Sequence, residues 1–216
     1  MERIIDGYIE ACSRGTYSVE SYTNDTLPDE RRAQIQELVL EKGHGCYKNE
    51  GLFEEDLDVH FVLMIHKNTV VGYIDYILVD TDRGTVQYIM YACNSSKFRG
   101  KHINILLHCY VFLQALIKGC FLLAVEAETD IIKHILVSKF KFTERNPHSY
   151  KNDDEYAKIS MDIKKEFNCY YDLREEGANK ALIECIRTTL TVANCKLKPP
   201  TRRKKGKGRK SSRRLR

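Results

Sequence analysis

Residues 88–107 combine a strand, a small polar loop and two cations in an order that suits the binding of phosphate. They read Tyr88-Ile-Met-Tyr-Ala-Cys-Asn-Ser-Ser-Lys-Phe-Arg-Gly-Lys-His-Ile-Asn-Ile-Leu-Leu107. An apolar strand turns through the loop into Arg99-Gly100-Lys101 and then directly into a helix. The first turn of a helix carries unpaired N–H groups, so a pyrophosphate is the natural ligand class. The plainer interpretation is an ordinary strand-to-helix turn with solvated basic residues.

The sequence up to the polar loop predicts four strands and one helix. Alternating or β-rich runs predict strands over 17–22, 59–66, 69–79 and 85–93. The turns at residues 67–68 and 82–84 join the last three strands, as is typical of an antiparallel meander. Between the first two strands, Pro28 with two following acids predicts the start of a helix, and Gly43 predicts its end.

The sequence after the polar loop predicts a helix that packs on the sheet and a buried strand. Apolar residues from Ile103 to Ile117 recur at helical spacing up to Gly119. The continuous apolar run 120–125 predicts a buried central strand. Further predictions are a helix over 131–139, strands over 141–144 and 156–163, and a C-terminal helix that includes Leu173 and ends at Asn194 or Cys195. The pattern predicts a mixed α/β (α+β) fold.

Two segments resemble motifs of the GNAT superfamily of N-acetyltransferases. Residues 98–104, Phe-Arg-Gly-Lys-His-Ile-Asn, fit the family's Tyr/Phe-Arg-Gly-Lys-Gly-Ile-Gly between its fourth strand and third helix. Residues 136–142, Leu-Val-Ser-Lys-Phe-Lys-Phe, resemble its Leu-Tyr-Glu-Lys-Leu-Gly-Phe. The order of elements over residues 17–163 also matches. The resemblance implies a splayed mixed sheet flanked by helices.

The resemblance also implies a site for acetyl-CoA as co-substrate. The pantetheine arm would lie along Tyr91, Ala92 and Cys93. The pyrophosphate would lie near Arg99, Gly100, Lys101, His102, Ile103 and Asn104. The family prefers Gly at the positions of His102 and Asn104, where a bare backbone lets the diphosphate approach closely.

The residues for acid–base chemistry depart from the family pattern. The family's Tyr that protonates the departing thiolate falls on Val137, and His134, one helical turn earlier, is the candidate substitute. The family often uses a strand carboxylate as the base that takes the proton of the amine. Glu126 and Glu128 are the nearest candidates here, with Tyr91 and Asp75 behind them. The alternative is that His134 is a solvated helix residue and that the two glutamates belong to an ordinary acidic helix start.

The basic charge of the chain is concentrated at its C-terminal end. The net charge is +5, but ten of the 35 Lys and Arg residues lie between 202 and 216, where no acid occurs. The first 201 residues therefore hold 25 basic and 30 acidic residues, a net charge of −5. The ten cations are Arg202, Arg203, Lys204, Lys205, Lys207, Arg209, Lys210, Arg213, Arg214 and Arg216. Such a tail suits non-specific nucleic acid or a nuclear import receptor, or serves only as a solubilising tail.

Cysteine usage and hydropathy favour an intracellular protein, in the cytoplasm, the nucleus or both. The N-terminus lacks a signal-peptide pattern, so we expect the eight cysteines to be reduced thiols. The chain has no Cys-x-x-Cys pair, and we expect no metal, although His102, His108 and Cys109 lie close in sequence. The most apolar run, 103–117, falls short of a membrane span.

We expect a GNAT-like acyltransferase domain over residues 1–165, a C-terminal helical extension over 166–198 and a disordered basic tail over 199–216. The first hypothesis is an N-acetyltransferase that moves acetyl from acetyl-CoA directly to an amine that the sequence does not identify. The second is a catalytically degenerate protein of the same fold that binds nucleic acid through its tail. The third is a structural or host-interaction protein with neither ligand.

Overall fold

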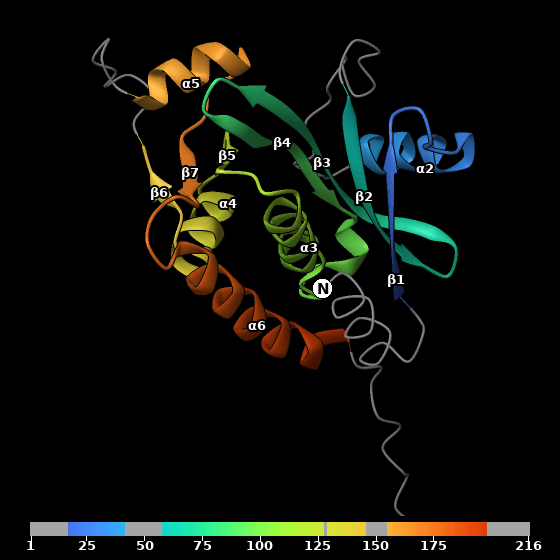
Figure 1. Cartoon of the computed structure of the whole chain (residues 1–216). Coiled ribbons are helices and arrows are strands. Elements are labelled where there is room, and N and C mark those ends of the chain that lie inside the picture. Colours follow the sequence, from blue (N-terminus) through green and yellow to red (C-terminus); the bar gives the residue numbers. More distant parts are fainter. Residues whose placement is uncertain (1–16, 42–57, 128, 146–154, 198–216) are drawn as a thin grey trace, which may run out of the picture.

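The computed structural model describes residues 17–41, 58–127, 129–145 and 155–197, which form a seven-stranded sheet with helices on both faces (Figure 1). The strands are β1 (Tyr17–Thr23), β2 (Val59–His66), β3 (Thr69–Thr81), β4 (Gly84–Asn94), β5 (Leu122–Val125), β6 (Thr143–Glu144) and β7 (Cys169–Asp172). The helices are α2 (Asp29–Leu40), α3 (Ile103–Lys118), α4 (Asp130–His134), α5 (Glu155–Ile163) and α6 (Ala178–Leu197). A 3-10 turn, Ser96–Phe98, precedes α3, and a π-helical segment, Ile135–Lys139, continues α4. The mixed α/β class that we expected is confirmed.

The strands lie in the order β1-β2-β3-β4-β5-β7-β6. β1 to β4 pair antiparallel, which confirms the predicted meander. β4 and β5 pair in parallel, and α3 is the crossover that such a pair requires. β7 pairs antiparallel with both β5 and β6. Among the described residues, one parallel pair therefore lies inside an otherwise antiparallel sheet.

Two clusters of buried side chains fill the opposite faces of the sheet. One joins α2 and α5 to the sheet and includes Ile35, Phe61 and Ile159. The other joins α3 and α6 to the opposite face and includes Leu106, Phe112 and Leu182. α6 packs along α3, so α3 is enclosed between the sheet and α6 (Figure 1). This enclosure explains why α3 is apolar on nearly all sides.

Helix α3 begins and ends where its sequence predicts. It begins at Ile103, and Gly119 ends it in the left-handed conformation at φ 71°. The Gly119 N–H is directed to the carbonyl oxygens of Ala115 and Leu116, as is typical of a glycine helix end. α2 ends at Leu40, and Gly43, which we expected to end it, lies outside the described residues.

The prediction of a strand over 156–163 is wrong, because these residues form α5. Ile159 and Ile163 are both buried, and their separation of four residues places them on one helical face. The strand that completes the sheet is β7, which lies beyond the boundary that we expected at residue 165. Leu173 follows β7, and the C-terminal helix begins only at Ala178.

Gly72 allows β3 to lie close to the start of α3. A Cβ atom at this position would lie 2.7 Å from Cγ2 of Ile103, 3.1 Å from Cβ of Asn94 and 3.2 Å from the carbonyl oxygen of Cys93. These residues belong to the end of β4 and the first turn of α3. A residue without a side chain at position 72 therefore sets how closely the polar loop approaches the sheet.

We expect Gly72→Ala to lower the free energy of unfolding by about 1–3 kcal/mol, because the added methyl group overpacks this contact. Urea denaturation measures the change. Ile103→Ala removes the nearest atom, so Gly72→Ala should cost less in that background. Equal costs in the two backgrounds would contradict the proposed contact.

Candidate functional site

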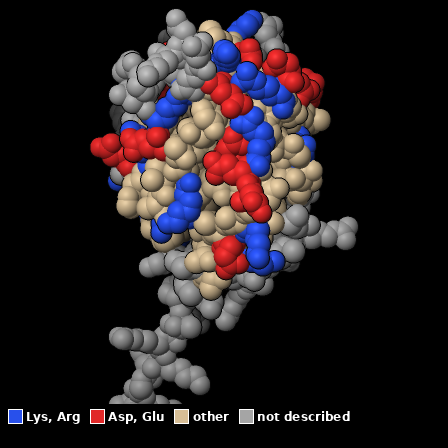
Figure 2. Space-filling view, turned by 60° about the vertical axis from the view of Figure 1, so that its left-hand side comes forward, with Lys and Arg blue, Asp and Glu red and all other residues tan. Residues whose placement is uncertain are grey.

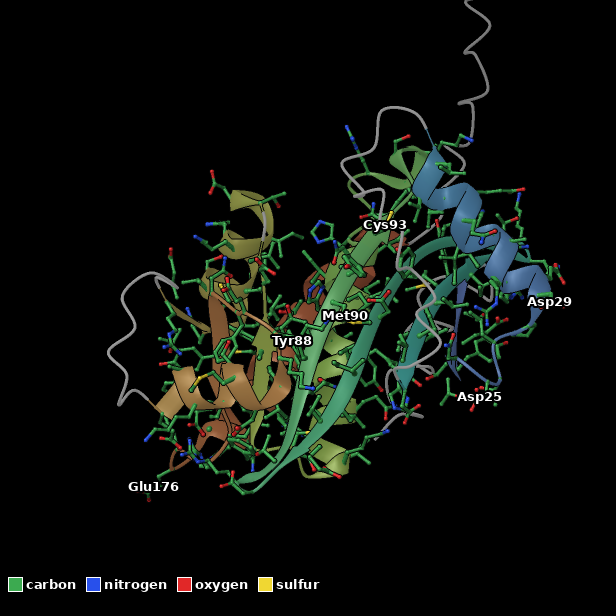
Figure 3. The ribbon with its side chains drawn as sticks, turned by 90° about the horizontal axis from the view of Figure 1, so that it is seen from above. Asp25, Asp29, Tyr88, Met90, Cys93 and Glu176 are labelled. Atoms are coloured by element: carbon green, nitrogen blue, oxygen red, sulfur yellow. The ribbon has the colours of Figure 1, made fainter. Side chains whose placement is uncertain are left out.

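The strands β4 and β5 pair over only part of the length of β4. The pairing runs from Val86 with Leu122 to Ile89 with Val125, and β4 continues to Asn94. Residues 90–94 therefore have no pairing partner among the described residues on the β5 side. Tyr88, Met90 and Cys93 lie along this strand in Figure 3. An unpaired strand edge offers backbone N–H and C=O groups to an extended ligand.

A bulge in β4 lies where this pairing ends. Tyr91 pairs with Asp75 of β3, but the next partner of β3, Tyr76, pairs with Ile89. Met90 is therefore the extra residue, and it has no pairing partner on either neighbouring strand of the described sheet. A bulge breaks the ladder locally and changes the direction of the backbone.

The carboxyl group of Asp75 accepts the backbone N–H of Tyr91 at the bulge, with 2.7 Å between Oδ1 and N. Asp75 is fully buried, and its Oδ2 atom has no hydrogen-bond partner among the described residues. Burial raises the pKa of Asp75 well above its ordinary value, against the smaller opposing effect of the backbone hydrogen bonds. Burial thus favours the neutral form of Asp75, which lies inside the sheet rather than facing solvent as a base would.

The polar loop after β4 forms compact turns that end at the N-terminus of α3. Backbone hydrogen bonds join the Ser95 N–H to the Val71 oxygen at 2.9 Å and the Lys101 N–H to the Phe98 oxygen at 3.1 Å. Within the described residues, no side chain caps the start of α3, so its first N–H groups remain available to an anion.

A cavity of about 630 Å³ extends from this helix N-terminus along β4 to the end of the β4–β5 pairing. Its walls come from β4, from the loop and first turns of α3, and from Val125 and the residues that follow β5. Between Asn94 and Met90, β4 rises about 3.3 Å per residue, or roughly 13 Å in total. The cavity therefore joins the N-terminus of α3 to the part of β4 that does not pair with β5.

Most of the predicted binding residues line this cavity. They are Tyr91, Ala92, Cys93, Arg99, Gly100, His102, Ile103 and Asn104. Lys101 is not among the lining residues. A Cβ atom at Gly100 would point into open space, so the loop leaves room beside this residue.

The structure separates the two candidate catalytic residues. Glu126 is exposed and lines the cavity directly after the last residue of β5. His134 is exposed at the end of α4 and is not among the residues that line the cavity. Val137 is half-buried against the core and is also outside that lining. Glu128 lies outside the described residues.

His108 and Met90 also line the cavity, although the motifs in the sequence did not predict it. His108 is buried, and its Nδ1 lies 2.8 Å from the carbonyl oxygen of Asn104, so Nδ1 donates and Nε2 is an acceptor. Nε2 has no hydrogen-bond partner among the described residues, and burial lowers the pKa of His108 to about 4. The sequence offers one sign of this position. His108 lies four residues after Asn104, so the two residues share a face of α3.

A second cavity of about 510 Å³ adjoins the first, since His102 and Ile105 line both. Its other walls are the π-helical segment with the residues after it, and α6. Lys139 and Lys141 are two exposed cations in this lining, and Glu184 is an exposed acid. This second space can accept a polar group that carries negative charge.

The backbone of His102 is strained at the point where the two cavities meet. The resemblance to the family implies that a glycine at this position serves close approach to a diphosphate. In the structure His102 adopts the left-handed conformation, at φ 61°, which costs a residue with a side chain roughly 1–2 kcal/mol. Gly100 has a positive φ angle as well, 75°, and as a glycine it adopts it freely.

The cysteines do not all match the expectation of reduced thiols. Cys93 is disulfide-bonded, whereas Cys109, Cys120, Cys169 and Cys185 are free. In the part of the chain that the structure describes, no three His, Cys, Asp or Glu side chains gather as a metal site would require. None of the described helices has the length and hydropathy needed to cross a membrane.

We expect Asp75→Asn to increase stability at neutral pH. Because the pKa of Asp75 is raised in the folded chain, the unfolded chain loses this proton at a lower pH than the folded chain, so the stability of the wild type falls as pH rises above about 4. The stability difference between the variant and the wild type should grow from pH 4 upward, by at most about 1.4 kcal/mol per pH unit. Urea denaturation across pH 4–7 measures it. Parallel stability curves for the two proteins would show that Asp75 titrates normally.

Solved structures with a similar fold include one that is named as an acetyltransferase and one in complex with a bisubstrate analogue. An acetyltransferase of the GNAT family from Staphylococcus aureus Mu50 aligns with a TM-score of 0.54 at 15% identity, over 73% of this chain and 99% of its own. Naa50 from Arabidopsis thaliana, in complex with the bisubstrate analogue CoA-Ac-MVNAL, aligns with a TM-score of 0.48 at 18% identity, over 72% of this chain and 95% of its own. No protein-family model and no curated protein matches the sequence. The chain therefore has the GNAT fold, the splayed mixed sheet that its two motifs implied.

Proposed function

We propose that the protein transfers an acetyl group from acetyl-CoA to an amine by direct attack within a ternary complex. The observation that carries this proposal is the cavity that joins the N-terminus of α3 to the unpaired edge of β4. One end suits a diphosphate, and the other suits an extended arm that ends in a reactive carbonyl. The solved structures with this fold are consistent with the proposal.

The proposed contacts with acetyl-CoA follow the cavity walls. The pyrophosphate binds the first N–H groups of α3, with Arg99 beside it. The pantetheine arm pairs with the backbone of residues 91–93 on the free side of β4. The adenosine end with its 3′-phosphate occupies the second cavity, next to Lys139 and Lys141. His102, which lines both cavities, lies where the two halves of the ligand meet.

The acyl group then lies at Met90, whose backbone is outside both strand ladders. The Met90 N–H is placed to hydrogen-bond the thioester oxygen as negative charge develops on it. Val125 pairs with Ile89, so Glu126 follows directly across the gap from Met90. Glu126 is therefore the proposed base, acting directly or through a water molecule.

In the proposed reaction the amine attacks the thioester and CoA departs in the same ternary complex. The amine nitrogen attacks the thioester carbon, the C–S bond breaks, and the amine proton passes to Glu126. CoA leaves as a thiolate, because Val137 has no proton to give and His134 does not line the cavity. A thiol pKa near 8.5 makes the thiolate an adequate leaving group, but we expect slower turnover than with a well-placed acid.

Acetyl-CoA should stabilise the folded protein by roughly 2.7 kcal/mol at a hundredfold excess over its dissociation constant. Thermal melting with and without millimolar acetyl-CoA measures this gain. Gly100→Glu should abolish it, because the added carboxylate repels the diphosphate. Gly177→Glu is the matched control, since Gly177 has nearly the same φ angle, 76° against 75°, and equally open surroundings. A loss of the shift in both variants, or no shift in the wild type, would contradict the cofactor assignment.

A second role, binding of nucleic acid, concerns residues 201–216, which lie outside the described residues. Its support is the ten cations without an acid between 202 and 216. On the face shown in Figure 2, acidic and basic side chains of the described residues are interspersed. The tail therefore carries the proposal, as a non-specific element for nucleic acid or for an import receptor.

Deleting residues 201–216 should remove most of the affinity for duplex DNA, because the remaining chain has a net charge of −5 before His is counted. If about five phosphates are engaged, log affinity should fall against log salt with a slope of roughly −4.5 in the full chain. Titrations of both proteins at several salt concentrations measure the two slopes. Equal binding by the two proteins would show that the tail is not the element that binds DNA.

A further inference from the structure

The β4 bulge releases a backbone amide that a strand ladder would normally use. The Tyr91 N–H instead donates to Oδ1 of Asp75, across the β3–β4 pair, at 2.7 Å. An amide left without an acceptor in a buried strand costs roughly 1–3 kcal/mol. Because the Asp75 side chain accepts this amide, the bulge does not carry the cost of an unpaired buried N–H group.

Asp75 is an unusual residue for its place in β3. Residues 70–77 are all buried, and Asp75 is the only Asp or Glu among these eight residues. Enclosing a carboxyl group is costly unless it is hydrogen-bonded. Its Oδ1 atom has the Tyr91 amide as a partner, while Oδ2 has none among the described residues. An apolar residue would fill this position at lower cost if packing alone were needed.

The bulge sets the direction in which the β4 side chains beyond it point. Without the extra residue at Met90, the pairing of β4 beyond Ile89 would shift by one position. A shift of one residue exchanges the two faces of a strand, so every side chain from Met90 to Asn94 would turn to the opposite side. The backbone of Met90 would also re-enter the ladder.

We propose that Asp75 is a positioning residue for the acyl end of bound acyl-CoA. By holding the Tyr91 amide it keeps the bulge formed, and the bulge keeps the Met90 backbone free for the thioester. This inference rests on the proposed function, because it assumes that acyl-CoA occupies the cavity. Asp75 itself is not among the residues that line the cavity, so it acts through Tyr91 and Met90.

The test compares three variants of the full chain. Asp75→Asn keeps an acceptor oxygen at the same place, and Asp75→Leu removes it at similar volume. Ile77→Ala is the control, because Ile77 is buried on the same face of β3 and pairs with Tyr88, away from the bulge. Amide hydrogen exchange reports on the Tyr91 N–H, and calorimetric titration gives the affinities for acetyl-CoA.

In Asp75→Leu we expect the Tyr91 amide to exchange at least tenfold faster and the affinity for acetyl-CoA to fall at least tenfold. In Asp75→Asn and Ile77→Ala the affinity for acetyl-CoA should stay within about threefold of the wild type, whereas amide exchange follows the overall stability of each variant. Recovery in the Asn variant separates the hydrogen bond from general loss of stability, which the Ile77→Ala control also reports. Asp75→Ala replaces the Leu variant if the latter does not fold.

Two outcomes would overturn the inference: unchanged acetyl-CoA affinity in Asp75→Leu, or an equal loss in the Asn and Leu variants. If the wild type itself does not bind acetyl-CoA, both the proposed function and this inference are contradicted. Wild-type binding with an unaffected Leu variant leaves the proposed function intact and removes only the role of Asp75.

Discussion

The site depends on where the hydrogen bonds of β4 go. Over residues 86–89 the strand is paired on both sides, and beyond that point it pairs only with β3 among the described strands. The hydrogen bond from the Tyr91 amide to Asp75 lies at this transition. Because buried backbone groups need partners, a strand leaves one neighbour only where another acceptor is supplied. The bulge at Met90 and the open edge of β4 therefore begin at the same point of the strand.

Much of the fold can be predicted from the sequence because its signals are local. The meander is visible from its turns, and α3 from its apolar period and Gly119. The loop is visible because its glycine and cations stand out between a strand and a helix. The prediction fails at α5 because Ile159, Met161 and Ile163 alternate with polar residues as in a strand, although the spacing of four between Ile159 and Ile163 also fits one helical face. The strand that completes the sheet is β7 instead.

The parts of the site that the sequence does not reveal depend on contacts between distant segments. Nothing in residues 88–94 marks Met90 as the extra residue, since its status depends on the register with β3. The one visible hint is Asp75, a single acid in the apolar run 70–79. The position of His134 outside the cavity lining likewise depends on how α4 packs, and spacing along the chain does not report it.

The order of strands also has a consequence for how the chain is made. β7 is the last of the described strands in sequence, yet it lies between β5 and β6. β6 pairs with β7 alone among the described strands, so it cannot join the sheet first. During synthesis at roughly 5–20 residues per second, β5 therefore keeps one edge unpaired for several seconds. A nascent chain that stops before Cys169 would present an apolar strand edge, the kind of surface that chaperones cover and that otherwise pairs with other chains.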